Sequence, residues 1–398
     1  MQIGTAFSVE ADTTTAVRHA ITELTKTLGG APRWILAQPS VAHDIDVVRR
    51  ELAAFAPGAA LHGSTSCLGA MTPAGFHSRE GAGLGLFAIV DDDGAFGVGA
   101  KRAGSDPAGA ARDAVREAVE AAGRPGEVPS LVWLSAAPGT EETVLRAIES
   151  VIGSEVPIVG GSSADNTVEG HWKQFTQRES FSDAIVVSAL FTTGRVASAF
   201  LSGYLPEGKR GRVTRAEGRK IVEIDGRPAA QVYDEWTGGI IRDALAGGGN
   251  ILSRTTLHPL GREVGSAAGV PYYRLAHPDS VTADGALSLF ADVEEGDVVH
   301  LMVGATDGLV ARAGRVAEEV LVRNELRTDA IAGALVIFCA GCMLTVKERM
   351  NEVVEGLDAA LAGRPFLGSF TFGEQGCMIG GENRHGNLMI SVTVFTAD

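Results

Sequence analysis

The same order of strand-like and helix-like segments occurs three times along the chain, and this internal repeat limits the possible folds more than any other feature. Each unit reads strand, helix, strand, helix, strand, and its third strand ends in a Gly-Ser pair. The pairs stand at Gly63-Ser64, Gly161-Ser162 and Gly368-Ser369. Because strands alternate with helices of ordinary length, we predict an α/β fold in which mixed sheets are covered by helices.

Each unit also has a capping acid ahead of its first helix, and hairpins follow the Gly-Ser strands of the first two units. Residues 1–102 have predicted strands at 3–7, 34–37 and 61–64, helices at 16–28 and 45–55, and a hairpin at 84–90 and 94–100. Residues 95–203 have strands at 96–101, 131–135 and 157–162, helices at 111–121 and 141–152, and a hairpin at 184–191 and 196–202. Residues 298–398 have strands at 298–304, 334–338, 365–369 and 387–395, and helices at 311–322 and 346–361. The capping acids are Asp12, Asp106 and Asp307.

The second interval between Gly-Ser pairs is about twice the first, which indicates an inserted segment at 206–297. Residues 206–212 have the composition of a linker, and Asp225-Gly226 predicts a hairpin tip ahead of a helix at 229–236. We therefore predict two domains. Residues 1–205 hold two repeat units, about 1–102 and 95–203, and residues 206–398 hold the insert and the third unit, 298–398.

Charge and composition exclude several classes of protein. The net charge is −15, from 49 acidic and 34 basic residues, so a nucleic-acid partner is not expected. Four cysteines are too few for a disulfide scaffold, and the amino-terminal sequence has no signal-peptide pattern. The longest apolar run, 333–343, is too short to span a bilayer. We expect a cytoplasmic protein with reduced thiols and no membrane insertion.

The Gly-Ser turns are candidate ligand-binding loops, because ligands of α/β sheets bind beyond the carboxyl ends of the strands. Glycine lets backbone amides approach a ligand, and short polar side chains can hydrogen-bond a carboxylate or an amide. The alternative is that small residues only make tight turns there. The candidate ligand-binding residues in these turns are Gly63, Ser64, Thr65, Ser66, Gly161, Ser162, Ser163, Asp165, Asn166 and Ser369.

Three of the cysteines and one glutamate are expected at the same end of the third unit. Cys339 and Cys342 follow its second strand, and Glu374 and Cys377 follow its third. A gap of two residues between thiols suits a redox pair or half of a zinc site, but no second close pair exists, so no metal site is predicted. Structural thiols, thiols that react or touch a ligand, and metal or redox chemistry all stay open.

Catalysis would need a base or a nucleophile. Glu374 is the best candidate for acid–base work and Asp165 the second, whereas Cys377 or Cys67 is the candidate nucleophile. His62, His171 and His385 fit a base, a haem ligand or an ordinary polar residue, and no histidine belongs to a metalloprotease motif. Serine-hydrolase, P-loop and dinucleotide-binding motifs are also absent from the sequence.

Several motifs together resemble the FIST family, with a FIST N module followed by a FIST C module. They span nearly the whole chain in the family's order: HGSTSCLGAM, VGGSSADN, VEIDGRPAAQVYDEW, YYRLAHPDS, DGALSLFADVEEGDVVHLM, ALVIFCAGC, LGSFTFGEQG and HGNLMISVTVF. Two departures exist. Cys342 stands where relatives have an arginine after a cysteine, and Cys67-Leu68-Gly69-Ala70 replaces the usual continuation of the first turn.

The resemblance implies a sensory module that binds a small polar metabolite such as an amino acid. Because the two modules account for the chain, we expect signalling through a separate partner. The expected pocket includes Cys339, Cys342, Glu374 and the Gly-Ser turns, with Cys377 in the same cluster. Two alternatives stay open: an enzyme without a cofactor that uses a cysteine nucleophile or a glutamate base, and a haem-based gas sensor, as some relatives are. No cofactor is otherwise predicted, and the oligomeric state is left open.

Overall fold

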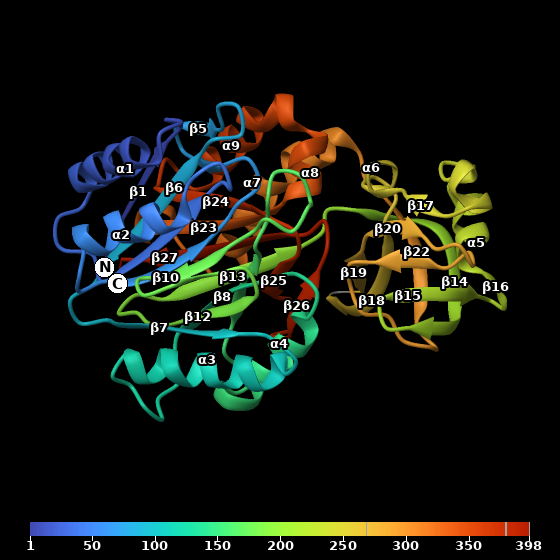
Figure 1. Ribbon diagram of the computed structural model, residues 1–398, viewed down its shortest axis with the longest axis horizontal. Helices are drawn as coiled ribbons and strands as arrows, with labels where there is room; N and C mark the ends of the chain where they lie inside the picture. Colours follow the sequence, from blue (N-terminus) through green and yellow to red (C-terminus); the bar gives the residue numbers. More distant parts are fainter. Residues whose placement is uncertain (268, 379, 398) are drawn as a thin grey trace.

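The computed structural model describes residues 1–267, 269–378 and 380–397. Three six-stranded mixed sheets enclose a shared apolar core, and a nine-stranded sheet forms a separate lobe (Figure 1). The core takes Trp34 and Phe87 from the first sheet, Trp133 from the second and Leu367 and Phe395 from the third. The predicted α/β fold of mixed sheets covered by helices is confirmed.

The three sheets of the body share one strand order. The first runs β1 (Gln2–Ser8), β6 (Leu84–Val90), β2 (Trp34–Pro39), β3 (Ala60–Ser64), β10 (Gln174–Thr176), β11 (Ser180–Phe181). The second runs β7 (Ala95–Arg102), β12 (Ala184–Phe191), β8 (Leu131–Ala136), β9 (Ile158–Ser162), β25 (Glu374–Cys377), β26 (Asn383–Gly386). The third runs β13 (Val196–Leu201), β27 (Ile390–Thr396), β23 (Ile331–Cys339), β24 (Phe366–Thr371), β4 (Ala70–Thr72), β5 (Gly75–His77). In each sheet the third and fourth strands are parallel and the other pairs antiparallel.

Each unit gives the short strand pair that follows its Gly-Ser strand to another unit's sheet. The pair β4–β5 joins the third sheet, β10–β11 the first and β25–β26 the second. This cyclic exchange interlocks the three sheets and brings the three Gly-Ser turns together. The shared strand order does not by itself establish a common origin of the three units, which stays a prediction.

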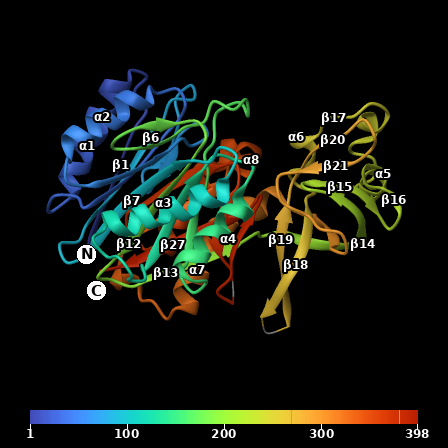
Figure 2. The ribbon, with the colours of Figure 1, turned by 60° about the horizontal axis from the view of Figure 1, so that its bottom comes forward.

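Helices cover the outer face of each sheet and bury an apolar stripe against it. Figure 2 shows two of them, α3 and α4, side by side on the second sheet. The helices are α1 (Thr13–Thr27) and α2 (Ile45–Phe55) on the first sheet, α3 (Pro107–Ala121) and α4 (Glu141–Ile152) on the second, and α7 (Thr306–Arg323), α8 (Ala340–Thr345) and α9 (Met350–Ala360) on the third. Short 3₁₀ turns lie at Arg242–Ala246, Thr328–Ala330 and Lys347–Arg349.

Two of the three predicted capping acids cap the first helix of their unit. Asp12 accepts the backbone N–H of Thr15, and Asp106 accepts that of Gly109, each at 2.8 Å. Asp307 instead lies inside the first turn of α7, which begins at Thr306 without a side-chain cap.

The two predicted hairpins are wrong. Strand β6 lies between β1 and β2, and β12 lies between β7 and β8, so both hydrogen-bonding edges of each strand are occupied. The segment that follows each of them therefore leaves its sheet and becomes the first strand of the next sheet: β7 pairs with β12, and β13 pairs with β27.

The strand predicted at 298–304 is present, but its assignment as the first strand of the third unit is wrong. Strand β22 (Val298–Val303) pairs with β14 (Leu205–Glu217) and β18 (Leu260–Ala267) in the separate lobe. Its expected place beside β27 is taken by β13, which precedes the insert in the sequence. The segment between β13 and α7 thus builds the lobe, so the lobe extends past the predicted end of the insert at 297.

The lobe contains the hairpin and the helix predicted near residue 225. Ile224 pairs with Arg227 across a turn in which Asp225 and Gly226 have φ of 51° and 72°. The remaining elements of the lobe are β15 (Lys220–Ile224), β16 (Arg227–Pro228), α5 (Ala229–Trp236), β17 (Gly249–Asn250), α6 (Leu252–Thr255), β19 (Val270–Ala276), β20 (Pro278–Val281) and β21 (Leu287–Leu289). Among the described residues, we find no helix with the length and apolar character to cross a membrane.

Candidate functional site

The three Gly-Ser turns meet at one end of the body, and they bind one another. Ser64 and Ser163 share a hydrogen bond of 2.8 Å between their hydroxyls. Backbone N–H groups also cross between turns, from Ala164 to Thr65, from Cys67 to Phe370 and from Ser162 to Gly373, at 2.8–3.0 Å. Because these amides have protein partners and the serines are buried, the contacts account for the turns without a ligand.

The other candidate residues of the turns are engaged in the same way. Ser66 accepts the N–H of Phe370 at 2.8 Å, and Ser369 pairs with Ala70 across the third sheet. A Cβ on Gly63 would lie 2.1 Å from the ring of Phe175. Glycine at this position therefore lets a strand of one unit touch the hairpin of another.

Asp165 and Asn166 fold the loop that follows the second turn. Burial acts to raise the pKa of Asp165, but backbone N–H groups of four loop residues, beginning with His171, outweigh it and lower that pKa. Asn166 accepts the N–H of Leu68 at 2.7 Å and donates to the carbonyl of Gly81 at 3.1 Å. Both side chains thus have structural partners.

Cys67 lies in the first Gly-Ser turn near Asp165, and Cys377 lies near Glu149 and Glu155. Burial and the Asp165 carboxylate raise the pKa of Cys67 to about 12. Burial and the carboxylates of Glu149 and Glu155 raise the pKa of Cys377 to about 11. Neither thiol ionises near neutral pH, so their positions give no support to a nucleophilic role.

Cys339, Cys342 and Glu374 do lie together, and two residues that the sequence analysis missed complete their cluster. Cys339 caps α8 and hydrogen-bonds the side chain of Cys342. The hydroxyl of Tyr204 is 3.5 Å from the Cys342 sulfur. Arg312 lies beside this sulfur and acts electrostatically on Glu374 as well. All five side chains are buried.

Arg312 is the most unusual member of this cluster. It occupies the apolar face of α7 at 1% exposure, and its Nη1 donates to the carbonyls of Ser202 and Leu388, each at 2.7 Å. The Tyr204 and Phe338 rings lie 5.9 and 4.9 Å from its guanidinium carbon. Its Nε and Nη2 have no hydrogen-bond partner of good geometry among the described residues. A buried cation with two unused donors requires an anion beside it.

Neighbouring groups and burial shift the pKa values of the two thiols and of Glu374. Burial acts to raise the pKa of Cys342, but the hydrogen bond from Cys339 and the Arg312 guanidinium outweigh it and lower that pKa to about 6. The hydrogen bond to Cys342, together with burial, raises the pKa of Cys339. Burial raises the pKa of Glu374, which accepts hydrogen bonds from Thr371 and from the backbone of Met389, each at 3.0 Å. Arg312 and Cys339 therefore favour the ionised form of Cys342.

A cavity of about 260 Å³ opens beside Arg312 and Tyr204. It lies between the end of β13, helix α7 and the β18–β19 hairpin of the lobe. Its wall combines aromatic and charged side chains, which suits a small polar ligand. The lining includes Tyr204, Tyr272, Tyr273, Arg312, Arg315 and Glu319.

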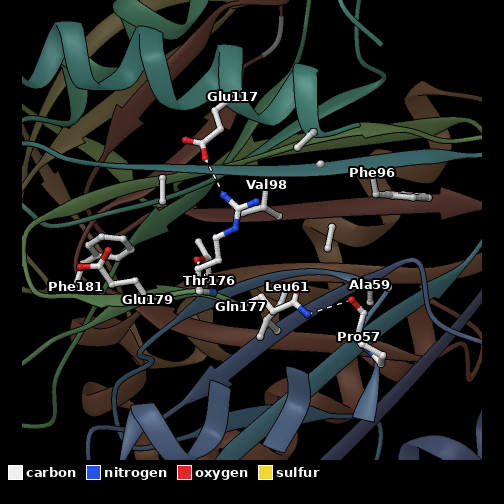
Figure 3. Close-up of a pocket in the computed structure, with 16 residues that line it drawn as sticks. Pro57, Ala59, Leu61, Phe96, Val98, Glu117, Thr176, Gln177, Glu179 and Phe181 are labelled. Atoms are coloured by element: carbon white, nitrogen blue, oxygen red, sulfur yellow. Dashed lines mark hydrogen bonds and ion pairs between the residues drawn. The ribbon is translucent and has the colours of Figure 1, made fainter. Parts of the chain in front are cut away.

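A second cavity, of about 370 Å³, lies between the first two units at the opposite ends of their parallel strands (Figure 3). Leu61, Phe96 and Val98 line it, and an ion pair between Glu117 and Arg178, 3.8 Å long, crosses it. No candidate site residue of the sequence analysis lines this cavity. Its polar side chains pair with one another, and we assign it no function.

A second buried polar cluster, which the sequence analysis also missed, joins the lobe to the second unit. The Arg219 guanidinium reaches Glu141 at 2.7 Å and Glu142 at 2.6 Å. Ligand atoms of these two glutamates and His385 lie within 4.8 Å of one another, the spacing of a metal site. Arg219 already occupies the space between the two carboxylates as their cation, so we assign the cluster no metal ion.

The three histidines named in the sequence analysis do not fit a haem ligand. Both ring nitrogens of His62 are hydrogen-bonded, to Ser188 at 2.8 Å and Ser135 at 2.9 Å. The ring nitrogens of His385 face Phe290 O at 3.2 Å and the Gln375 amide at 3.4 Å. His171 is exposed. None of these three offers a free nitrogen in an apolar pocket, as haem iron needs.

An α/β body with a buried cationic group beside a cavity is the arrangement of a small-ligand-binding protein. The chain belongs to the FIST family: residues 34–227 match the FIST N domain and residues 229–377 the FIST C domain, which together form sensory modules for small ligands. The family predicted from the sequence motifs is thus confirmed.

Individual relatives add little to this assignment. Uncharacterized protein MJ1623 of Methanocaldococcus jannaschii is 34% identical over 92 residues, which make up 23% of this chain and 18% of that protein. The chain thus spans about a fifth of that relative's length. Among solved structures, a cyanuric acid hydrolase has a TM-score of 0.41 at 9% identity and covers 99% of both chains. The cyanuric acid hydrolase of A. caulinodans has a TM-score of 0.42 at 9% identity and covers 100% of this chain and 99% of its own.

Proposed function

We propose that the protein is a cytoplasmic sensor of a small carboxylate-bearing metabolite, with amino acids as the first candidates, and that it signals through a separate partner protein. One observation carries the proposal: Arg312 is fully buried in the wall of a cavity, and two of its nitrogens have no partner of good geometry among the described residues. A carboxylate offers two oxygens to these donors and adds to the negative charge that the Cys342 sulfur already brings to the guanidinium.

The rest of the cavity wall fits the remainder of such a ligand. Glu319 lies on the same helix as Arg312 and lines the cavity, where it pairs with Arg323, so the ammonium group of an amino acid would share this carboxylate with Arg323. Tyr272 and Tyr273 offer rings on which an aliphatic side chain can pack. The volume of about 260 Å³ suits a metabolite and excludes a peptide or a nucleotide chain.

The experiment is a calorimetric screen of the common amino acids, acetate and succinate against the wild type and an Arg312→Met variant. We expect at least one carboxylate to bind, and the variant to bind it at least about 100-fold more weakly, because a paired charge-assisted contact is lost. Arg327→Gln, which removes an exposed arginine paired with Asp329, is the matched control and keeps wild-type affinity.

Arg312 also supports two carbonyl groups, so its loss can affect folding. Tyr204→Phe is a milder substitution in the wall of the cavity than Arg312→Met, because it removes one hydroxyl group and keeps the aromatic ring. A folded Arg312→Met protein, verified by circular dichroism, that binds the same carboxylate with unchanged affinity would remove Arg312 from the site. An absence of binding by every carboxylate tested would overturn the proposed ligand class.

A cofactor-independent enzyme is the second candidate function, and the position of the Cys342 sulfur beside Arg312 and 3.5 Å from the Tyr204 hydroxyl is the observation that favours it. In that case Cys342 takes the role of nucleophile that the sequence assigned to Cys377 or Cys67. Glu374, whose pKa is raised by burial, then acts as a proton donor at neutral pH. Turnover of a bound carboxylate that ends on Cys342→Ser substitution would favour this candidate.

A further inference from the structure

We propose that Cys339 and Cys342 are a reversible dithiol–disulfide site that reacts with hydroperoxides, with Cys342 as the first thiol to react, and that its oxidation releases Arg312 for the anionic ligand. The first half of this statement depends only on the thiols and their neighbours. The second half rests on the ligand site proposed above.

The geometry of the pair favours a disulfide. Cys339 caps α8 and Cys342 follows three residues later, so both side chains lie on the first turn of one helix. The two thiols interact directly, and this interaction raises the pKa of Cys339. A spacing of two residues between cysteines is also that of thiol oxidoreductases, which close this ring easily. Little movement of the backbone is needed to join the two sulfurs.

The surroundings assign different roles to the two thiols. Arg312 stabilises a negative charge on Cys342, whereas the Tyr204 hydroxyl, 3.5 Å from the sulfur, donates its proton to the Thr256 carbonyl at 2.9 Å. Cys339 keeps its proton, because a thiolate there would lie against the Cys342 thiolate and the Glu374 carboxyl group. Cys342 is therefore the attacking thiol, and Cys339 is the thiol that resolves the intermediate.

A route to the pair exists for a very small oxidant. Cys342 is buried and Cys339 is 6% exposed, so a large reagent cannot reach the sulfurs directly. The cavity of about 260 Å³ ends on Tyr204 and Arg312, the two side chains that touch Cys342. Hydrogen peroxide is little larger than water and can enter through this cavity after a side-chain movement.

The chemistry balances in two steps. The Cys342 thiolate attacks one oxygen of the hydroperoxide, the O–O bond breaks, and a sulfenic acid and an alkoxide or hydroxide form, which takes up a proton. The Cys339 sulfur then attacks the Cys342 sulfur, the S–O bond breaks, and water leaves with the Cys339 proton. Two thiols are oxidised to one disulfide, and one hydroperoxide is reduced to an alcohol, or to water when it is hydrogen peroxide.

Oxidation also changes the charge beside Arg312. In the reduced protein the Cys342 thiolate neutralises the guanidinium. A disulfide has no charge, so the buried cation loses its anion and attracts a carboxylate from the cavity more strongly. We expect the oxidised protein to bind the carboxylate found by the calorimetric screen about tenfold more tightly than the reduced protein does.

The test uses hydrogen peroxide at a small molar excess, with intact-mass and peptide-mass spectrometry. The wild type is expected to lose about 2 Da, the mass of two hydrogen atoms, with residues 339 and 342 joined in one peptide, and to recover on reduction with dithiothreitol. In Cys339→Ser the Cys342 sulfenic acid accumulates and is detected as a gain of about 16 Da, one oxygen atom, in the intact mass. Cys377→Ser behaves as the wild type and is the matched control.

Each other outcome contradicts the inference. A thiol pair that keeps its mass under peroxide overturns it, and so does oxidation confined to Cys377 or Cys67. A disulfide that forms while carboxylate affinity stays the same overturns the link to Arg312. A disulfide in a protein that binds no carboxylate refutes the proposed ligand alone, whereas carboxylate binding without a disulfide refutes the thiol site alone.

Discussion

A Gly160→Ala variant is expected to lose at least about 3 kcal/mol of folding free energy and to accumulate in the insoluble fraction on expression. The Cβ of an alanine at this position would lie 1.8 Å from the carbonyl oxygen of Leu134. That oxygen belongs to the backbone of β8, the parallel neighbour of β9, and cannot turn aside as a side chain would. Gly160 also has a φ of +154°, which alanine adopts rarely.

The clash at Gly160 affects two strand pairs, β8–β9 and β9–β25. Gly160 pairs on its other side with Gln375 of β25, the strand that the third unit gives to the second sheet. Separating β8 from β9 therefore also weakens the contact between two units, so we expect a lower urea midpoint for the whole body. Gly58→Ala is the matched control, because no atom of the described residues lies within 4 Å of its added Cβ. Equal urea midpoints for the two variants would contradict this role of the glycine.

This prediction changes the interpretation of the Gly-Ser turns. The sequence predicts that small residues at strand ends bring backbone amides to a ligand. In the structure, a Cβ on Gly161 would lie 2.3 Å from Thr371 of another unit. Small residues stand at these positions because strands of different units touch there, and ligand contact is not needed to explain them.

Local elements were predictable from the sequence, whereas strand partners were not. Helices such as 45–55 and 141–152 follow from apolar periodicity, which depends on neighbours a few residues away. The choice of partner for β7 or β13 depends on which sheet edges are free after other segments have paired. The exchanged strand pair β25–β26 lies more than 200 residues from the second unit's Gly-Ser strand, and no local pattern records such a contact.

The candidate site was predictable in part for a similar reason. Cys339, Cys342 and Glu374 follow strand ends, so their meeting at one edge follows from strand order. The sequence does contain an indication that Arg312 is buried. It occupies a core position between Leu309 and Val316 on an otherwise apolar helix face. A charged residue on such a face indicates a buried partner or a ligand.

No comparable sequence pattern indicates the role of Arg219, because its partners Glu141 and Glu142 lie 78 and 77 residues earlier in the chain. We expect Arg219→Met to cost about 3–5 kcal/mol of folding free energy at neutral pH, since it leaves Glu141 and Glu142 buried without a cation. Glu142 keeps only the Asp292 N–H, at 2.8 Å, among its strong partners. Arg227→Met, which breaks an exposed ion pair with Glu235, is the matched control and leaves stability unchanged.

The pH dependence distinguishes this mechanism from a loss of packing. Burial alone acts to raise the pKa of Glu141, but the charges of His385 and Arg219 and the hydrogen bonds of Ser162 and Arg219 lower it from 4.5 to about 2. In the wild type this carboxylate therefore stabilises the fold above pH 4.5, and the stabilisation is lost as the pH falls toward 2. Without Arg219 the burial effect dominates, the pKa rises, and protonation of the carboxylate stabilises the folded variant.

The free-energy difference between wild type and Arg219→Met should accordingly shrink as the pH falls from 7.5 to 4.5, as measured by urea unfolding at both pH values. A difference that does not depend on pH would mean that the Arg219 side chain acts through packing. Adding Glu141→Gln and Glu142→Gln to Arg219→Met should recover most of the lost stability at pH 7.5, because it removes the uncompensated charges. The lobe would then be held to the second unit by neutral hydrogen bonds, and residues 141 and 142 would no longer contribute to the pH dependence of the unfolding free energy.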